Sequence, residues 1–447
     1  GSQLGDRLAG AGERAAGAAL GAAASQADLD VRSRVMAENP TLIPRLANGF
    51  GGEFSVAIGQ GMFGREEDAI QDALDMTRVE AYGERTWLIR MPIVNAVLFE
   101  TDEGLVLVDA GMAPAGPALL QAIRSVSDAP LHTIIYTHGH VDHAYGTWAL
   151  IEAGETPEIV AQEKLIRRFE RYLKIPGSLA RYMSQPEEHL PRSRDDLVWP
   201  TRTFRDRLEL EIGGERFVLA PHPAETDDQL YVWVPGRGAL ASADYYQGFL
   251  PNAGNGKRVQ RDVEGWAVAL REMAALEPSL LLPAHGAAIT EPAMIQENFG
   301  VLAEALEHII AHTLRGLDQG LRKDLIFGSV ELPPHLAMHP TLEVQYVTPQ
   351  DISKMLLKKY TGWWNDIPSN WTPAPLAEQG RSIVELAGGM EALATYTRSI
   401  AKQNVRRASH LADYAFYADP DHPTAQALVL EVYKQRILDP RSNTMEN

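Results

Sequence analysis

The chain has 447 residues, of which 45% are hydrophobic and 22% charged, and this composition predicts about two to three globular domains. Its formal net charge of −18 argues against a nucleic-acid partner, because binding to polyphosphate depends on clustered lysine and arginine. The absence of cysteine excludes disulfides, thiolate metal ligands and cysteine nucleophiles, and no apolar run reaches the roughly 18 residues of a membrane span. A small anionic substrate is compatible with this charge, since a local cationic pocket can form on an acidic surface.

Residues 1–75 are predicted to form an N-terminal leader or arm. This part is rich in alanine and glycine, and glycine clusters at 49–52 and 59–61 indicate loops. We expect it to pack on its own domain or on a neighbouring subunit.

A strand-rich pattern begins near residue 76. Apolar runs at 86–90, 95–100 and 104–111 predict three strands, and a helix at 116–126 leads to a fourth strand at 131–136. Strands followed by a helix and a further strand indicate a layered α/β core. The third run ends in Asp109, an acid at the tip of a strand.

The fourth strand runs directly into a cluster of potential metal ligands. His138, His140, Asp142 and His143 lie within six positions, and imidazole nitrogen and carboxylate oxygen are both good zinc ligands. So few residues cannot wrap all four groups around one ion without crowding. We therefore expect two ions side by side, with His138 and His140 on one and Asp142 and His143 on the other.

Later strands also end in polar residues. A helix at 163–173 and an irregular loop at 185–200 precede strands at 208–212 and 216–220, which Gly213-Gly214 joins as a hairpin. Further strands are predicted at 229–234, 239–244 and 279–286. The polar residues at or beside the ends of these strands are His222, Glu225, Asp244 and His285. A rigid scaffold can gather residues that are distant in sequence into one site in this way.

The remainder of the chain is predicted to be helical. Helices are expected at 297–315, 351–360, 390–404, 408–418 and 424–437, with an aromatic, turn-like segment at 361–368. The predicted boundaries are a leader at 1–75, a catalytic domain at 76–300, a helical connection with the aromatic segment at 301–375, and a helical domain at 376–447.

The His-x-His-x-Asp-His motif and the later strand-end ligands resemble the metallo-β-lactamase superfamily over roughly residues 76–300. Within it, the chain resembles the alkylsulfatase branch. That branch has a glutamate where other members have a histidine, as in Pro223-Ala224-Glu225-Thr226, and an acid at the bridging position, as in Ala243-Asp244. Two further features match its C-terminal region, an Ala-Asp-Pro-Asp turn at 418–421 and a Tyr-x-Gly-Trp stretch at 360–363.

The resemblance implies an αββα sandwich followed by an all-α domain that forms a homodimer through its C-terminal helices. It implies two zinc ions per chain, with Asp142 and Asp244 as the catalytic carboxylates and Asp244 as the bridge. His222 competes with Glu225 as a ligand, and the Pro-x-x-Thr register favours Glu225. A periplasmic or secreted protein is favoured over a cytoplasmic one. The implied metal ligands are His138, His140, Asp142, His143, Glu225, Asp244 and His285.

Two departures from the branch concern the substrate. Alkylsulfatases carry Asn-Leu-Tyr-x-x-Arg-Gly after the bridging acid; here Asn252 remains, but Lys257 and Arg258 stand in place of Arg-Gly. A lysine does not reproduce the fork of an arginine. The branch's Ser-His-Asn is replaced by Gln-Asp-Ile at 350–352. Asn252, Lys257 and Arg258 are the predicted sulfate-binding residues, with Tyr360 as a lower-ranked pocket wall.

The favoured function is a dinuclear zinc hydrolase of alkyl sulfate esters, in which a metal-activated hydroxide attacks the ester. The first alternative is a hydrolase of another ester, a lactone or a phosphoester on the same metal pair. The second alternative is a non-catalytic, metal-stabilised dimer scaffold.

Overall fold

The computed structural model describes residues 62–183 and 187–438. Most of the predicted leader, and residues 439–447 of the predicted C-terminal domain, therefore lie outside the described residues. The described chain divides into two compact units, with the boundary between Asn365 and Asp366.

Two β-sheets form the centre of the first unit. The larger sheet has the strand order β1-β2-β3-β4-β5-β6-β7, and the smaller has the order β12-β11-β10-β9-β8. Strands β4 to β7 run parallel to one another, as do β11 and β12, and the other pairs are antiparallel. The strands are β1 (Arg78–Ala81), β2 (Thr86–Arg90), β3 (Asn95–Thr101), β4 (Gly104–Val108), β5 (Leu131–Ile135), β6 (Glu158–Gln162), β7 (Arg202–Phe204), β8 (Leu208–Ile212), β9 (Glu215–Pro221), β10 (Leu230–Val234), β11 (Ala239–Ala241) and β12 (Leu280–Leu282).

The inner faces of the two sheets pack against each other. Val97 and Phe99 of β3 share one buried cluster with Phe217 and Leu219 of β9. The alternate residues of β3, such as Leu98, belong to a second cluster on the opposite face of the larger sheet. Because side chains alternate along a strand, both faces of these apolar strands are buried.

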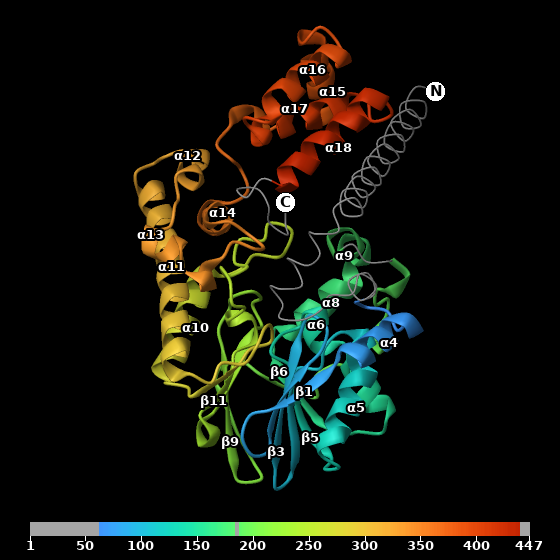
Figure 1. The fold of residues 1–447 in the computed structure, drawn as a ribbon, viewed down its shortest axis with the longest axis vertical. Helices are drawn as coiled ribbons and strands as arrows, with labels where there is room; N and C mark the ends of the chain where they lie inside the picture. Colours follow the sequence, from blue (N-terminus) through green and yellow to red (C-terminus); the bar gives the residue numbers. More distant parts are fainter. Residues whose placement is uncertain (1–61, 184–186, 439–447) are drawn as a thin grey trace, which may run out of the picture. The chain divides into compact units, whose positions relative to one another are not determined.

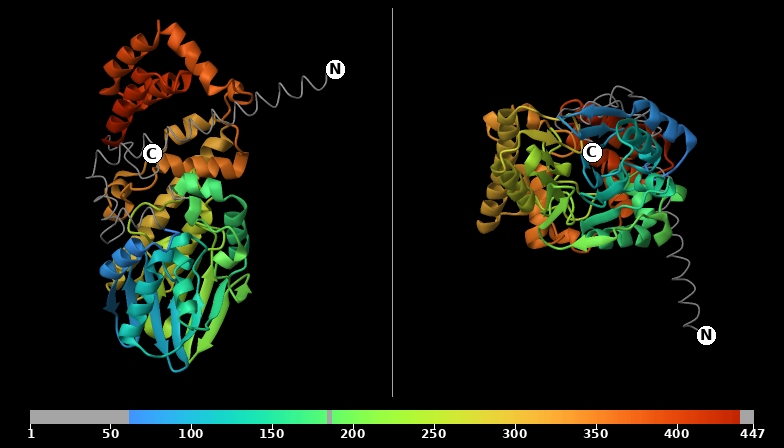
Figure 2. Two further views of the ribbon diagram at one scale, coloured as in Figure 1. Left: turned by 90° about the vertical axis from the view of Figure 1, so that its right-hand side faces the viewer. Right: turned by 90° about the horizontal axis from the view of Figure 1, so that it is seen from below.

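Helices cover the outer faces of this sandwich (Figures 1 and 2). Helices α4, α5 and α8 lie against the larger sheet, while α10, α11 and α14 cover the smaller one. This arrangement confirms the predicted αββα sandwich. The helices of this unit are α4 (Glu67–Met76), α5 (Gly116–Val126), α6 (Val141–Ala144), α7 (Thr147–Glu152), α8 (Leu165–Lys174), α9 (Pro176–Met183), α10 (Val263–Ala275), α11 (Pro292–Asp318), α12 (Lys323–Gly328), α13 (Pro334–Ala337) and α14 (Pro349–Thr361), together with short 3₁₀ turns such as η5 (Ala243–Tyr245).

The second unit is entirely helical. It contains α15 (Leu376–Leu386), α16 (Met390–Ala401), α17 (Val405–Ala418) and α18 (Pro423–Leu438), and the last three share an apolar core. A Cβ atom on Gly380 of α15 would lie 2.4 Å from the carbonyl oxygen of Tyr414, so glycine allows α15 to approach α17 closely. Throughout the described ranges, no helix combines the length and the apolar content needed to cross a lipid bilayer.

Candidate metal centre

The motif at residues 137–143 begins where β5 ends and continues into the short helix α6. Thr137 donates two hydrogen bonds to the carboxylate of Asp109, from its backbone nitrogen (2.8 Å) and from Oγ1 (2.7 Å). The same carboxylate lies 2.8 Å from Nδ1 of His143. Since β4 and β5 are parallel neighbours, Asp109 at the end of β4 lies beside the motif and anchors its first and last residues.

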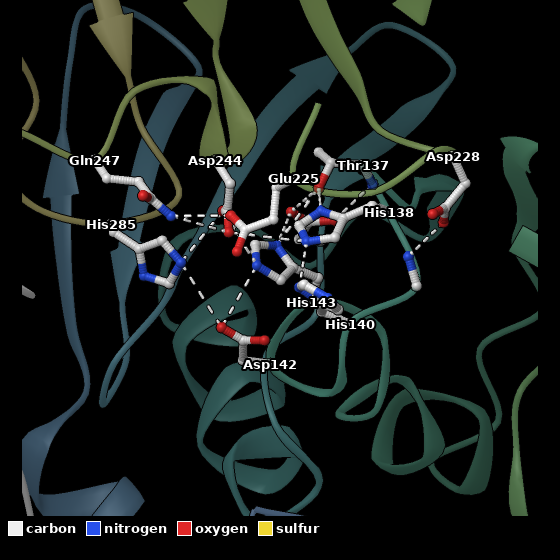
Figure 3. A network of polar contacts seen from close by, with 12 residues as sticks. Thr137, His138, His140, Asp142, His143, Glu225, Asp228, Asp244, Gln247 and His285 are labelled. Atoms are coloured by element: carbon white, nitrogen blue, oxygen red, sulfur yellow. Dashed lines mark hydrogen bonds and ion pairs between the residues drawn. The ribbon is translucent and has the colours of Figure 1, made fainter. Parts of the chain in front are cut away.

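The seven predicted ligands converge at this edge of the sandwich (Figure 3). Their side-chain nitrogen and oxygen atoms form three overlapping groups, and within each group these atoms lie within 4.8 Å of one another. The groups are His138, His143 and Asp244; Asp142, His143 and His285; and His140, Glu225 and Asp244. His140 and Glu225 thus share a group, and Asp142 shares one with His143 and His285. His138, predicted to share an ion with His140, groups instead with His143 and Asp244.

Asp244 is the most central of these residues. Its carboxylate lies 3.2 Å from Nε2 of His285, 3.3 Å from Nε2 of His143 and 3.8 Å from Nε2 of His138. Asp142 lies 3.5 Å from His143 and 3.7 Å from His285. A carboxylate that reaches two imidazoles of the motif and a third from a distant part of the chain is well placed to bridge two ions.

Glu225 and His222 lie on opposite sides of the connection between β9 and β10. Glu225 is buried and joins the cluster, whereas Nε2 of His222 lies 2.8 Å from the carboxylate of Glu272, and its ring stacks on Tyr231. The geometry therefore favours Glu225 as the ligand and gives His222 a packing role at the outer side of the smaller sheet.

Strained backbone lies next to three of the site elements. Ile93, Asp109 and Ala243 are three of the six non-glycine residues with positive φ in the described ranges. Such conformations cost roughly 1–3 kcal/mol each and persist only where the surroundings enforce them. Here Ile93 offers its carbonyl oxygen to Nδ1 of His285 at 2.7 Å, and Ala243 directly precedes Asp244.

A second set of buried polar residues supports the ligands, and we did not predict these from the sequence. Gln247 donates to Glu225 at 3.1 Å and to Asp244 at 3.3 Å. Asp228 accepts from the backbone nitrogen of Gly139 at 2.7 Å and from Nε of Arg168 at 2.8 Å. These contacts hold the His138–His140 segment and the carboxylates of Glu225 and Asp244 in place. Residues that hydrogen-bond to metal ligands orient them in the same way.

Arg261 is a further residue that sequence reasoning missed. It is 1% exposed, and its guanidinium forms an ion pair with the carboxylate of Glu225. In the sequence, Arg261 looks like a charged residue of a solvent-exposed loop. Asp262, a helix N-cap, and the apolar residues after it indicate that the loop ends at this point, but they do not indicate that Arg261 is buried.

Burial and neighbouring charge shift the pKa values of the cluster in opposite directions. Burial raises the pKa of Glu225 to about 8, although Arg261 opposes this shift. Burial alone would also raise the pKa of Asp244, but the neighbouring histidines, led by His285 and His143, outweigh it and hold that pKa well below its ordinary value. Burial lowers the pKa of His138 to about 3, so this imidazole is neutral, as a metal ligand must be.

The donor set fits metal ions. Asp142, Glu225 and Asp244 bring three carboxyl groups into one buried space. Neighbouring histidines hold the pKa values of Asp142 and Asp244 below their ordinary values, so these two carry negative charge, which is costly to bury without a partner. Nε2 of His143 and Oδ1 of Asp244 are buried and lack a hydrogen-bond partner. Imidazole nitrogens and carboxylate oxygens with open ligand atoms are the groups that zinc takes up.

The predicted substrate-binding residues lie in different environments. Asn252 is 5% exposed, and its side-chain oxygen has no hydrogen-bond partner. Lys257 and Arg258 are half-buried in the same loop. Tyr360, near the end of α14, is 49% exposed and donates its hydroxyl to Glu264 at 2.6 Å. Asn252 is thus the most enclosed of the four.

Comparisons with known proteins agree with this architecture. Residues 90–285 match the metallo-beta-lactamase superfamily, and residues 323–447 match the alkyl sulfatase dimerisation family. A linear primary-alkylsulfatase of Pseudomonas sp. (strain ATCC 19151) is 28% identical over 366 residues, which is 76% of this chain and 69% of that protein. An alkyl/aryl-sulfatase of Saccharomyces cerevisiae is 23% identical over 388 residues, which is 80% of this chain and 60% of the yeast protein. Among solved structures, a stereoselective inverting sec-alkylsulfatase from Pseudomonas sp. superposes with a TM-score of 0.71 at 18% identity, over 88% of this chain and 70% of that one.

Proposed function

The chain belongs to the alkylsulfatase branch of the metallo-β-lactamase superfamily, and on this basis we propose that it is a dinuclear zinc hydrolase that cleaves alkyl sulfate esters to alcohol and sulfate. The observation that carries the proposal is the position of the Asp244 carboxylate, within 3.8 Å of His138 and His143 in the motif after β5 and of His285 after β12. The relatives named as alkylsulfatases support the choice of substrate.

In this proposal each ion has three ligands of its own and one that is shared. His138, His140 and Glu225 would hold one ion, and Asp142, His143 and His285 would hold the other. Asp244 would be shared by the two. Zinc ions bound in this way supply a hydroxide nucleophile at neutral pH and stabilise developing negative charge.

The protein itself binds and orients the ester. Asn252 offers a buried amide to the sulfate group, while Lys257 and Arg258, half-buried in the same loop, offer positive charge. Asp142 and Asp244 are the carboxylates nearest to the reacting atoms. Tyr360 forms a more distant wall of the pocket.

The active form is proposed to be a homodimer joined through the C-terminal helices, with a periplasmic or secreted location. The match to the alkyl sulfatase dimerisation family supports the dimer. Leu376 and Leu386 of α15 are exposed to 50% and 84%, and this apolar surface is suited to a second copy of the chain.

One observation favours a different substrate on the same metal pair. Lys257 and Arg258 stand where the alkylsulfatase branch has Arg-Gly, and an ammonium group does not reproduce a bidentate guanidinium. Another ester, a lactone or a phosphoester is therefore the second candidate class of substrate.

The experiment is sulfate release from a primary alkyl sulfate by purified protein, before and after chelation and after zinc is returned. We expect release that chelation abolishes and zinc restores. Metal-dependent cleavage of a lactone or phosphoester with no sulfate release would favour the second class. Fewer than one zinc per chain in well-folded protein would instead indicate a non-catalytic scaffold.

A further inference from the structure

The strongest unexplained feature near the site is Arg261. Arginine is almost never fully buried unless it is paired, yet Arg261 is 1% exposed and its partner Glu225 is 5% exposed. Burying two charges is expensive and is repaid only by good geometry and further hydrogen bonds. A pair at this depth, with one member in the candidate metal centre, indicates a role in the reaction.

The backbone around both residues is fixed by short contacts. The backbone nitrogen of Asp262 donates to the carbonyl oxygen of Ala224 at 2.8 Å, and these two residues adjoin Arg261 and Glu225 in the chain. The carboxylate of Asp262 also caps α10 through the nitrogen of Gly265 at 2.8 Å.

The first turn of α10 and the Glu225 segment also lie in close contact. A Cβ atom on Gly265 would lie 2.1 Å from the carbonyl oxygen of Pro223, so only glycine permits this approach. Arg261 therefore faces Glu225 from a rigid support rather than from a freely moving loop.

The guanidinium retains a donor beyond this ion pair. An arginine carries five N–H donors in a planar fork. Nη1 of Arg261 is the atom paired with Glu225, whereas Nε is buried without a hydrogen-bond partner. Arg261 can thus hold Glu225 and still bind an anion.

We propose that Arg261 positions the Glu225 carboxylate and is the principal cation for the anionic group of the substrate, a role predicted from the sequence for Lys257 and Arg258. This inference rests on the proposed hydrolysis of sulfate esters. Three carboxylates offset most of the charge of two divalent ions, and Arg261 adds fixed positive charge for an anion. A planar guanidinium can pair with Glu225 through Nη1 and at the same time donate from Nε to a sulfate oxygen, an arrangement that an ammonium group does not reproduce.

The test compares Arg261→Gln and Arg261→Lys with the wild type and with Arg237→Gln. The control is apt because Arg237 also forms a largely enclosed ion pair, with Glu215 at 2.9 Å, and bonds to the backbone of Glu100. The measurements are kcat and KM for an alkyl sulfate, kcat/KM for a neutral ester, the affinity of zinc-loaded protein for inorganic sulfate, zinc content and melting temperature.

We expect Arg261→Gln to raise KM for the alkyl sulfate and to weaken sulfate binding about 10- to 100-fold, the usual range for a lost charged hydrogen bond. Arg261→Lys should recover part of this loss, because charge is kept and the fork is not. Neutral-ester cleavage should fall less than sulfate-ester cleavage. Arg237→Gln should lower the melting temperature and leave sulfate affinity unchanged.

Unchanged sulfate affinity in zinc-replete Arg261→Gln would overturn the inference. A loss of sulfate affinity in Arg258→Gln that exceeds the loss in Arg261→Gln would also overturn it. If Arg261→Gln fails to fold, sulfate affinity is measured for Arg261→Lys instead. The inference then requires that this affinity is lower than that of the wild type. Wild-type protein that cleaves no sulfate ester contradicts the proposed function, and the role of Arg261 is then decided by sulfate binding alone.

Discussion

The carboxylate of Asp109 lies 2.8 Å from Nδ1 of His143, while Nε2 of the same ring lies 3.3 Å from Asp244. A carboxylate can only accept, so Nδ1 carries a proton in this contact, and Nε2 is the ring atom that would be left to bind a metal ion. The contact sets the tautomer that a metal ligand requires. Asp109 is therefore part of the site, although it is not one of the predicted ligands.

Replacing Asp109 with asparagine should reduce zinc affinity about 10- to 100-fold, the usual effect of losing an outer-shell partner. An amide provides one acceptor and two donors, so it cannot hold Thr137 and His143 as the carboxylate does. Competition with a chromophoric chelator measures the affinity. The matched control is Asp102→Asn, an exposed carboxylate paired with Arg85, which should bind zinc as the wild type does. Wild-type affinity in Asp109→Asn would show that the contact does not orient His143.

Arg168→Met should lower the free energy of unfolding by about 3 kcal/mol, because it leaves the buried Asp228 without its ion-pair partner. Urea unfolding at neutral pH measures the change. The control is Arg216→Gln, which breaks an exposed pair with Glu209 and should have no measurable effect. A loss no greater than that of the control would mean that the pair contributes little to stability.

The same pair predicts a dependence on pH. Burial alone would raise the pKa of Asp228, but Arg168 outweighs it and holds that pKa below its ordinary value. A depressed pKa stabilises the fold fully above the pKa of the unfolded carboxyl, about 4, and this stability is lost as pH falls through the lower folded value. Arg168→Met removes the largest influence that opposes burial, so acid unfolding should begin at a higher pH than in the wild type. Coincident acid-unfolding curves would contradict this explanation.

Asn252→Asp should raise KM for an alkyl sulfate at least about 10-fold, since it places a negative charge where the proposal puts the sulfate. Steady-state kinetics with saturating zinc measure the effect. The control is Asn298→Asp in α11, because the Asn298 amide is engaged by Tyr246 and Thr341. That variant should be less stable with an unchanged KM. Equal KM values in Asn252→Asp and the wild type would show that Asn252 does not bind the sulfate group.

Leu386→Asp should shift the protein from dimer to monomer. Leu386 is 84% exposed on α15, and a charge at the centre of an apolar interface is costly to bury. Light scattering after size exclusion measures the mass across a concentration series. Val268→Asp, at a residue 54% exposed in α10, places the same charge on an exposed apolar residue outside the region that matches the dimerisation family and should leave the dimer intact. A dimer of unchanged affinity in Leu386→Asp would locate the interface elsewhere.

Much of the fold was predictable because its strands are short apolar runs with clear ends. The predicted strand 86–90 and helix 116–126 match β2 and α5, and Gly213-Gly214 forms the expected hairpin turn with positive φ at both residues. The αββα sandwich followed by an all-α domain was likewise correct. The HxHxDH motif could be recognised because its four candidate ligands lie within six positions of the sequence.

Other features could not be predicted because they depend on contacts between distant parts of the chain. Helix α10 was missed, although Asp262 before Val263 is a recognisable N-cap. Arg168 and Gln247 resemble solvated polar residues in the sequence, and only the folded structure brings them to Asp228 and Glu225. A single sequence carries no signal for such pairs.

The most direct test of the central claim is sulfate release from a primary alkyl sulfate, measured together with the zinc content of the same protein. We predict two zinc ions per chain and release of sulfate and alcohol in equal amounts, both lost on chelation and both restored by zinc. Protein that holds two zinc ions and cleaves a lactone or phosphoester, but releases no sulfate from any alkyl sulfate, would contradict the claim.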